Sequence, residues 1–395
     1  MASVFDKYAS VAIASLSEYD SPELEAALDS ALGSIGAWEL IKPGMHVVIK
    51  ANLVSAMKPS EAGTTHPKLL YALAKRLIEC GASVTLGDSP GGLYNSAFVG
   101  RVYKVTGMHA LTELGVKLND DFSEKSASYA EAKVLHSFTY TGYLDSADLI
   151  INFAKLKSHG MMGMSCAAKN MFGAIPGVIK PEYHYRFPKY EDFANMILDL
   201  DEYFHPEISI ADAVWGMEGN GPTAGTPKKI GCILASRSPH TLDLAAAKML
   251  GYTVNDLPLL VAAKERGLIP DTAEELNIIG DIEPFIIKDF EHVVERRSLE
   301  FSGTGKNPVK RFFAKIAAAI LKTKPYLVKK MCVGCGICKN ICPAKAINIE
   351  NGKAKIQRKD CIRCFCCQEF CPKSAMKVRR TFIANLFHSE NKKKK

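Results

Sequence analysis

Residues 332–343 read CVGCGICKNICP and residues 361–372 read CIRCFCCQEFCP, and these two stretches decide the fold of the C-terminal part of the chain. Each stretch places three cysteines at every third position, then a fourth cysteine four residues further on, followed directly by proline. This Cys-x2-Cys-x2-Cys-x3-Cys-Pro spacing is typical of segments whose thiolates hold 4Fe–4S clusters. Two such segments supply eight thiolates, so the sequence predicts two 4Fe–4S clusters.

In paired segments of this kind, the fourth cysteine of each segment crosses to the cluster held by the other. The proline that follows then turns the chain away. We therefore expect a first cysteine set of Cys332, Cys335, Cys338 and Cys371, and a second cysteine set of Cys361, Cys364, Cys367 and Cys342. The arrangement resembles the two-cluster bacterial ferredoxin, which implies a small α+β domain that transfers electrons.

The two halves of this region repeat one another, because residues 342–349 (CPAKAINI) and 371–378 (CPKSAMKV) share one pattern. Between the halves, Asn351-Gly352 predicts a two-residue β-hairpin turn. Structural zinc is the alternative, but zinc gives no reason for eight ligands in two triplets that are each closed by Cys-Pro. Cys366 is a ninth thiol, which is either a spare thiol, an exchanging ligand or a small residue packed near a cluster.

Length and composition indicate a globular protein with a further, larger part. The chain has 395 residues and is 47% apolar, and no stretch reaches the roughly 20 apolar residues of a membrane span. Residues 1–16 lack the basic region that begins a signal peptide. Nine of the twelve cysteines lie in residues 332–371 and need a reducing compartment to bind iron. We therefore expect a cytoplasmic protein without a transmembrane span.

Charge is divided unevenly along the chain. Residues 1–300 carry 27 basic and 38 acidic side chains, whereas residues 301–395 carry 23 basic and four acidic ones. Clusters and their thiolates offset part of this positive charge, and the remainder predicts a partner with an acidic surface. That surface belongs to the chain's own larger domain, to an acidic redox protein or, as a peripheral contact, to an anionic membrane. No nucleic-acid-binding fold is recognisable, so nucleic acid is not an expected partner.

We expect four consecutive parts: an α/β domain at 1–300, a basic amphipathic helical linker at 301–330, the two-cluster domain at 331–380 and a basic tail at 381–395. The linker helix is predicted from Lys310 to Lys322, before Pro325. Its apolar stripe is expected to pack on the protein's own domains or, alternatively, to lie on a membrane surface.

Strand-like and helical patterns alternate through the first 290 residues, which predicts an α/β domain with a mainly parallel, doubly wound sheet. The expected strands are 10–16, 46–50, 83–86, 149–153, 208–211, 230–235 and 284–287. The expected helices are 22–35, 67–80, 190–203 and 239–250. The first helix is expected to begin with Ser21 as N-cap and Pro22 as its first residue.

Polar residues follow four of these strands, at the sheet edge where open α/β sheets bind ligands. They comprise Lys50 and Asn52, Asp88 in the glycine loop 87–92, Lys155, Lys157 and His159 in 155–160, and Asp212 and Glu218 in 212–222. This combination is suited to holding a small anion near a proton donor. Each residue also has an ordinary explanation, such as a surface lysine or an aspartate that caps a turn, and only their convergence predicts a site.

Several of these blocks resemble the domain-of-unknown-function family 362. The closest runs are 155–159 (KLKSH), 169–177 (KNMFGAIPG) and 180–184 (KPEYH), and further matches are 50–52, 65–67, 87–90 and 212–222. The resemblance covers most of residues 1–300 and implies a shared architecture, often with a C-terminal ferredoxin module, without naming a reaction. By analogy, the domain also has a distant similarity to lactate-racemase-like domains, but the sequence contains no nickel-cofactor motif that supports it.

The leading hypothesis is an iron–sulfur oxidoreductase whose clusters pass single electrons to or from a small anionic substrate in the α/β domain. Lysines would hold the anion, a histidine would carry the accompanying proton, and carboxylates would orient both. The predicted catalytic residues are His159, His184, Lys155, Lys157, Asp88 and Asp212. The predicted substrate-binding residues are Lys50, Asn52, Lys169, Asn170, Lys180 and Glu218.

Two alternatives remain open. In the first, the protein is a non-enzymatic electron-transfer adaptor that docks a redox partner protein, and salt weakens electron delivery by screening the charges. In the second, the clusters are structural or redox-sensing, and the larger domain performs non-redox chemistry.

Overall fold

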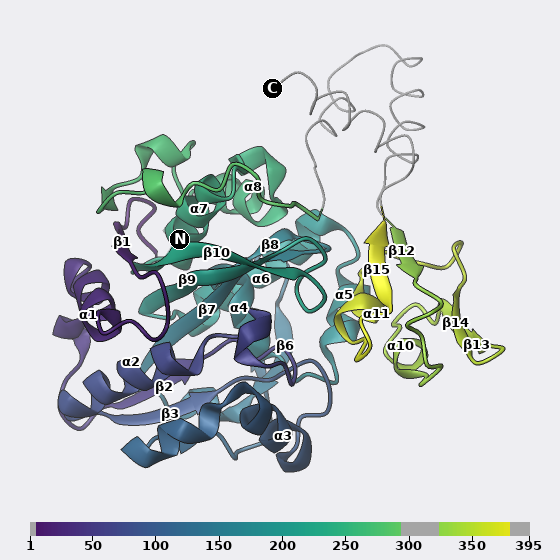
Figure 1. The fold of residues 1–395 in the computed structure, drawn as a ribbon, viewed down its shortest axis with the longest axis horizontal. Helices are drawn as coiled ribbons and strands as arrows, with labels where there is room; N and C mark the ends of the chain where they lie inside the picture. The colour runs from purple at the N-terminus through teal and green to yellow at the C-terminus, as the bar shows by residue number, and fades with distance from the viewer. Residues whose placement is uncertain (1–4, 294–323, 380–395) are drawn as a thin grey trace, which may run out of the picture.

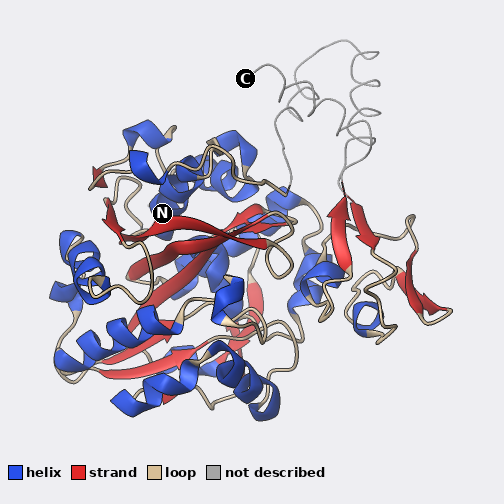
Figure 2. Cartoon of the chain, viewed as in Figure 1, coloured by secondary structure: helices blue, strands red, loops and turns tan. Residues whose placement is uncertain are grey.

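A computed structural model describes residues 5–293 and 324–379 of the chain (Figure 1). Residues 5–293 form an α/β domain, and residues 324–379 form a small β-rich module beside it (Figure 2). The predicted linker helix at 310–322 and the basic tail at 381–395 lie outside the described residues. Within the two described ranges, no helix combines the length and the apolar character that a membrane span requires.

The α/β domain is built on one sheet of nine strands. In spatial order these are β11 (Ile278–Ile279), β1 (Val11–Ser15), β10 (Thr226–Ser236), β9 (Ile208–Glu218), β7 (Leu149–His159), β2 (His46–Lys50), β3 (Ser83–Gly87) and β4 (Lys117–Leu118), and β8 (Gly163–Ser165) pairs with the end of β7. Five of the eight strand pairs are parallel, which confirms the prediction of a mainly parallel sheet. Strand β10 is antiparallel to both of its neighbours.

Helices pack on both faces of this sheet, as in other doubly wound folds. One apolar core joins the sheet to α1 (Leu24–Ser34), α2 (Pro67–Glu79) and α3 (Ser96–Thr106). The opposite core joins it to α4 (Ala167–Asn170), α6 (Tyr190–Phe204), α7 (Pro239–Met249) and α8 (Pro258–Glu265). Strand residues alternate between the cores, since Val11 and Ile13 belong to one and Ala12 to the other. A hairpin of β5 (Glu124–Ser128) and β6 (Ser137–Thr141) and helix α5 (Lys180–Arg186) complete the domain.

Two central strands are longer than predicted. Strand β7 continues to His159 and β9 to Glu218, whereas the predicted ends were residues 153 and 211. Both continue because they pair with one another, with Lys155 opposite Asp212, and because β8 pairs with the last residues of β7. The candidate site residues that we placed in loops after these strands therefore lie within the strands, whereas residues 160 and 219–222 follow them.

Two further predictions are wrong. Residues 284–287 form no strand, because Pro284 lies in the first turn of a 3-10 helix at Glu283–Phe285. Helix α1 begins at Leu24 with Glu23 as N-cap, instead of beginning at Pro22. The Ser21 hydroxyl accepts a hydrogen bond from the Glu23 amide (3.2 Å), so Ser21 closes a turn before the helix. The helices predicted at 67–80, 190–203 and 239–250 match α2, α6 and α7 to within one residue.

The module has two similar halves. Helix α10 (Ile337–Asn340) follows the first two cysteines of one half, and α11 (Cys366–Glu369) has the same place in the other. Strands β12 (Lys324–Leu327) and β15 (Met376–Arg379) pair antiparallel, as do β13 (Ile347–Glu350) and β14 (Lys353–Ile356). Asn351 and Gly352 both have positive φ, 49° and 69°, so the predicted hairpin turn is confirmed.

Candidate anion and electron-transfer site

Each of the two cysteine sets lines a cavity of its own. Cys332, Cys335, Cys338 and Cys371 line one cavity, which is partly open to solvent. Cys342, Cys361, Cys364 and Cys367 line the other cavity, which is likewise partly open to solvent. The crossing cysteines also accept backbone hydrogen bonds at sulfur, Cys342 from the Ala346 amide and Cys371 from the Ala375 amide, both at 3.2 Å. Four converging thiols with amide donors to sulfur are the donor set that a 4Fe–4S cluster needs, so the residues fit two clusters.

Cys366 and Cys367 have different surroundings, although both line the second cavity. Cys367 belongs to the core of the module, and burial together with the neighbouring thiols of Cys364 and Cys361 raises its pKa. Cys366 is fully buried and acts electrostatically on Lys169 of the α/β domain. These positions favour Cys367 as the ligand and place Cys366 between the second cysteine set and the α/β domain.

Five lysines are buried in the α/β domain near the carboxyl ends of β2, β3 and β7. Lys50, Lys155 and Lys157 are each 1% exposed, and Lys169 and Lys180 are each 8% exposed. A buried ammonium group is costly unless a carboxylate or hydrogen-bond acceptors compensate it. The partners of each lysine therefore show whether it has a structural role or is available to a ligand.

Two of the five lysines are neutralised by carboxylates. Lys50 Nζ lies 2.7 Å from Asp88 Oδ1, and Lys155 Nζ lies 2.8 Å from Asp212 Oδ2. The first pair needs a glycine at position 173, where a Cβ atom would fall 2.2 Å from Asp88 Oδ1 and 2.3 Å from Lys50 Nζ. In both pairs, a carboxylate of the protein balances the charge of the lysine.

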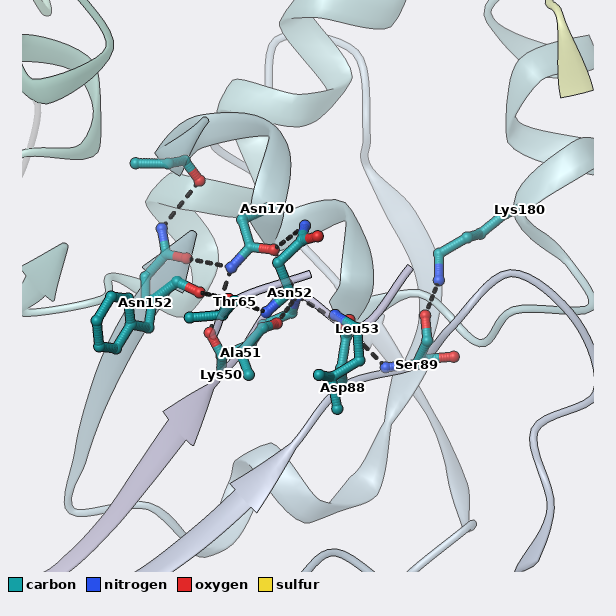
Figure 3. A network of polar contacts seen from close by, with 12 residues as sticks. Lys50, Ala51, Asn52, Leu53, Thr65, Asp88, Ser89, Asn152, Asn170 and Lys180 are labelled. Atoms are coloured by element: carbon teal, nitrogen blue, oxygen red, sulfur yellow. Dashed lines mark hydrogen bonds and ion pairs between the residues drawn. The ribbon is translucent and has the colours of Figure 1, made fainter. Parts of the chain in front are cut away.

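Asparagine side chains extend the Lys50 pair into a network (Figure 3). Asn170 Oδ1 accepts hydrogen bonds from Lys50 Nζ (3.0 Å) and Asn52 Nδ2 (2.8 Å). Asn170 Nδ2 donates to Asn152 Oδ1 (2.8 Å) and to the Lys50 carbonyl (3.2 Å). The donors and acceptors of Asn170 are thus used within the protein, which gives Asn52 and Asn170 a positioning role in this structure.

The Lys155 pair belongs to a second network, formed with residues that the sequence did not single out for the site. Asp212 accepts hydrogen bonds from the Tyr19 hydroxyl (2.8 Å) and the His66 amide (3.0 Å), and Lys155 Nζ donates to the same hydroxyl at 2.8 Å. The rings of Tyr19 and His66 stack with centroids 3.6 Å apart. Burial lowers the pKa of His66 to about 4, so this imidazole is neutral.

Lys157, Lys169 and Lys180 form what we call the lysine group, and among the described residues none of them has a carboxylate at ion-pair distance. Lys157 Nζ donates to Asn52 Oδ1 (2.8 Å) and to the Gly63 carbonyl (2.7 Å), and Lys180 Nζ donates to the Ser89 carbonyl. Burial, with a smaller contribution from the positive charge of Lys169, lowers the pKa of Lys157 to about 7. Burial, with smaller contributions from the charges of Lys50 and Lys169, lowers the pKa of Lys180 to about 7 as well. Burial also lowers the pKa of Lys169.

The ring of Phe172 connects the lysine group to His184. Lys169 Nζ lies 5.5 Å and Lys180 Nζ 5.9 Å from the ring centroid, and the His184 ring lies 5.7 Å away. Burial, with a contribution from Lys169, lowers the pKa of His184 to about 3, so its imidazole is neutral. Its Nδ1 atom is buried and has no hydrogen bond to a described residue. A neutral histidine with an available nitrogen thus lies beside two ammonium groups.

His159 and Glu218 lie at the ends of their strands and make other contacts. His159 Nδ1 accepts hydrogen bonds from the amides of Met161 and Met162, both at 3.1 Å, which leaves the proton of the neutral ring on Nε2. The Glu218 carboxylate accepts from the Glu291 amide (2.9 Å) and lies 3.9 Å from Lys228 Nζ. The contacts of Glu218 are therefore with the β10 side of the sheet instead of the lysine group.

The second half of the module packs on the α/β domain beside the lysine group. Gln368 Nε2 donates to the carbonyls of Asn220 (2.8 Å) and Gly221 (3.0 Å), and the Thr223 hydroxyl donates to the Glu369 carbonyl (3.2 Å). Phe365 joins the apolar core of the α/β domain. The Glu369 carboxylate lies beyond ion-pair distance of the lysine group. Its negative charge offsets part of the lowering of the pKa of all three lysines. The second cysteine set is consequently the one next to the lysines.

The structure divides ten of the twelve predicted site residues among three places, and His159 and Glu218 make the separate contacts described above. Lys50, Asn52, Asp88 and Asn170 share one network, Lys155 and Asp212 a second, and Lys157, Lys169, Lys180 and His184 a third region next to the module. Sequence reasoning did not single out Phe172, Ser89, Gln368 and Glu369. Phe172 could have been found within the run KNMFGAIPG, whereas nothing in the sequence indicated how the module packs.

Comparisons with known proteins agree with this architecture. Residues 47–248 match the family described as domain of unknown function (DUF362), and residues 324–372 match a 4Fe–4S dicluster domain. The thylakoid-associated protein sll1697 of Synechocystis sp. (strain ATCC 27184 / PCC 6803 / Kazusa) is 30% identical over 269 residues, which cover 67% of this chain and 82% of that protein.

Among solved structures, the lactate racemase apoprotein from Thermoanaerobacterium thermosaccharolyticum superposes with a TM-score of 0.34 at 14% identity. The match covers 51% of this chain and 50% of the racemase, so the chain spans about half the length of that protein. The matches to the family and to the thylakoid-associated protein show the relationship directly: the chain belongs to the DUF362 family and carries a 4Fe–4S dicluster domain at its C-terminal end.

Proposed function

We propose that this protein is an iron–sulfur oxidoreductase that exchanges single electrons with a small anionic substrate held by the lysine group. One observation supports this most strongly: three buried ammonium groups, without a carboxylate at ion-pair distance among the described residues, lie where the second cysteine set packs on the α/β domain. When bound, the 4Fe–4S clusters supply one-electron transfer. A cytoplasmic location is part of the proposal, because iron-binding thiols need a reducing compartment.

The lysine group is suited to an anion because its positive charge is both buried and held in place. Asn52 Oδ1 and the Gly63 carbonyl fix Lys157, and the Ser89 carbonyl fixes Lys180. An anion that receives hydrogen bonds from these ammonium groups would favour their charged forms and offset the cost of burying them. Lys50 and Lys155 contribute no net charge, since Asp88 and Asp212 neutralise them.

In this proposal, a histidine side chain carries the proton that accompanies the electron. His184 has a buried Nδ1 atom beside Lys169 and Lys180, and His159 carries its proton on Nε2 because Nδ1 accepts two backbone hydrogen bonds. Both rings are positioned by the protein, His184 by stacking on Phe193 with centroids 4.4 Å apart. Either imidazole can therefore hold a proton at a fixed place while the charge of the substrate changes.

An anaerobic reoxidation experiment tests the proposal. The reduced protein is mixed separately with the small-molecule and the macromolecular fractions of its own cell extract, and cluster absorbance is followed. We expect the small-molecule fraction to reoxidise the parent protein, but not the variant Lys169→Met or the double variant His159→Ala/His184→Ala at full iron content. Lys104→Met, at an exposed lysine of α3 with no ion pair among the described residues, is the matched control and should react like the parent.

The other outcomes would contradict the proposal in distinct ways. Reoxidation only by macromolecules, with strong salt dependence, would indicate the electron-transfer adaptor. Full reactivity of Lys169→Met would show that the lysine group does not hold the substrate. An activity that survives removal of both clusters would indicate non-redox chemistry in the α/β domain.

A further inference from the structure

The loop that carries the first cysteine set exposes large apolar side chains. Met331 and Ile337 are each 39% exposed, and Val333 is 61% exposed. Cys335, which lies between them in the sequence, is the one exposed thiol of the eight in the two sets. Exposed apolar side chains gathered on one functional loop mark an interaction site, whereas single exposed apolar residues need no explanation.

Exposed lysines lie within three residues of the cysteines of the first set. They are Lys329, Lys330, Lys339 and Lys373, and none of them forms an ion pair with a described residue. Lys373 also lines the cavity of the first cysteine set. Residues 324–378 carry twelve basic and three acidic side chains in all. The face formed by Met331, Val333, Ile337 and these four lysines, which we call the outer face, therefore has an apolar centre and a strongly positive rim.

The outer face is turned away from the α/β domain. The module contacts that domain through α11 and β15, while α10 and the β13–β14 hairpin lie on its far side (Figure 1). The contacts with the domain are made by neutral groups such as Gln368 and Phe365. Among the described residues, no lysine or arginine of the module pairs with a carboxylate of the domain, so the α/β domain leaves the positive charge of the outer face available.

Charge complementarity identifies the occupant. The predicted linker segment 310–322 is itself basic and carries no acidic residue, so the lysine rim repels it. The outer faces of two copies repel one another for the same reason, since both carry the lysine rim. An acidic partner is attracted by the rim. Because Cys335 brings the first cysteine set to the surface beside this rim, the acidic partner that fits is a one-electron carrier.

We propose that the outer face docks an acidic one-electron carrier protein and is the place where electrons are exchanged with the module. In the exchange one electron leaves the reduced centre of the carrier and enters the module, so the carrier is oxidised by one electron and this protein is reduced by one, with no bond made or broken. The lysine rim steers the encounter, and the apolar centre excludes water from the contact. Docking at the outer face is independent of the anion site, because the absorbance of the clusters reports reduction of the module without any substrate.

Stopped-flow reduction of the full-length oxidised protein, with both clusters loaded, tests the outer face. The probes are two acidic carriers, reduced flavodoxin and reduced plant-type 2Fe–2S ferredoxin, and one small cationic reductant, the methyl viologen radical. We expect the rate constant with both carriers to fall as salt is raised, and to fall about tenfold or more in Lys330→Glu/Lys373→Glu and in Ile337→Glu. Methyl viologen should reduce these variants at least as fast as the parent.

Matched variants on the α/β domain separate docking from general charge effects. Leu93→Glu replaces an exposed apolar residue and Lys104→Glu an exposed lysine, and both should be reduced by the carriers like the parent. The proposal is overturned if the carriers fail to reduce a protein that methyl viologen reduces, if salt and the outer-face variants have no effect, or if the control variants slow reduction equally. A dimer in sedimentation that Ile337→Glu dissociates would assign the outer face to self-association and overturn the proposal too.

Discussion

The same substitution at two buried lysines should change stability in opposite directions. Lys50 and Lys169 are both almost fully buried, but Lys50 is paired with Asp88 at 2.7 Å, whereas Lys169 has no ion pair or hydrogen bond from Nζ to a described residue. Methionine has a similar length and no charge. Lys50→Met leaves a buried carboxylate without its partner, while Lys169→Met removes a buried charge that has none.

The magnitudes follow from these contacts. Removing one member of a buried ion pair costs about 3–5 kcal/mol, which is the loss we expect for Lys50→Met. For Lys169→Met, relieving a buried unpaired polar group contributes about 1–3 kcal/mol of stability. Against this stands the contact of Lys169 Nζ with the Phe172 ring at 5.5 Å, worth about 0.5–2 kcal/mol. The net expectation is a stabilisation on the order of 1 kcal/mol.

Thermal unfolding of the cluster-loaded proteins measures this difference, with iron content checked for each variant. A stabilisation of 1 kcal/mol raises Tm by roughly 2 °C in a domain of this size, whereas Lys50→Met should lower Tm by several times that amount. Lys104→Met, at an exposed site, should leave Tm unchanged. The reasoning is refuted if Lys169→Met lowers Tm as strongly as Lys50→Met, because Lys169 would then have to be a structural cation.

Four further predictions concern the lysine group and the module. Lys157 and Lys180 have pKa values lowered from 10.5 to about 7, so they lose protons as pH rises through 7. Calorimetric titration at pH 6 and pH 8 should therefore show weaker anion binding at the higher pH. The affinity should fall by at most about tenfold per pH unit for each lysine. Without an anion the unfolded state binds more protons between about pH 7 and 10.5, so denaturation should show stability rising across that window. Cys366→Ser should keep all its iron, whereas Cys367→Ser should lose about half by iron analysis, since one of two clusters loses a ligand. Gln368→Ala removes the hydrogen bonds to two carbonyls, at a cost of about 1–3 kcal/mol, and should speed hydrogen exchange at residues 219–223 while iron content stays constant.

Local patterns made much of the fold predictable. The spacing of the cysteines is short-range, as is the Asn351-Gly352 turn, and both are read directly from neighbouring residues. Helices such as α2 and α6 were found because their apolar stripes and end signals lie within a few turns. Six of the seven predicted strands lie in the sheet for the same reason, whereas the short strands β4, β8 and β11 were not predicted.

The candidate site was only partly predictable because its contacts are long-range. Lys155 and Lys157 were expected in a loop, since charged residues rarely lie in a fully buried strand, and only pairing of β7 with β9 explains their burial. That Asp212 neutralises Lys155 depends on the register of two strands 57 residues apart, which no local pattern gives. The position of Gln368 against Asn220 depends on how two separately folded parts pack, and sequence periodicity carries no information on that.

Capture of a small anion by the purified protein tests the central claim most directly. The cluster-loaded protein is incubated with the small-molecule fraction of its own cells and washed, and the ligands released on denaturation are identified by mass spectrometry, with Lys169→Met and Lys104→Met treated alike. We predict that the parent and Lys104→Met enrich the same small anion, that Lys169→Met does not, and that this anion reoxidises the reduced parent protein. Enrichment of no anion, or equal enrichment by Lys169→Met, would contradict a substrate site at the lysine group.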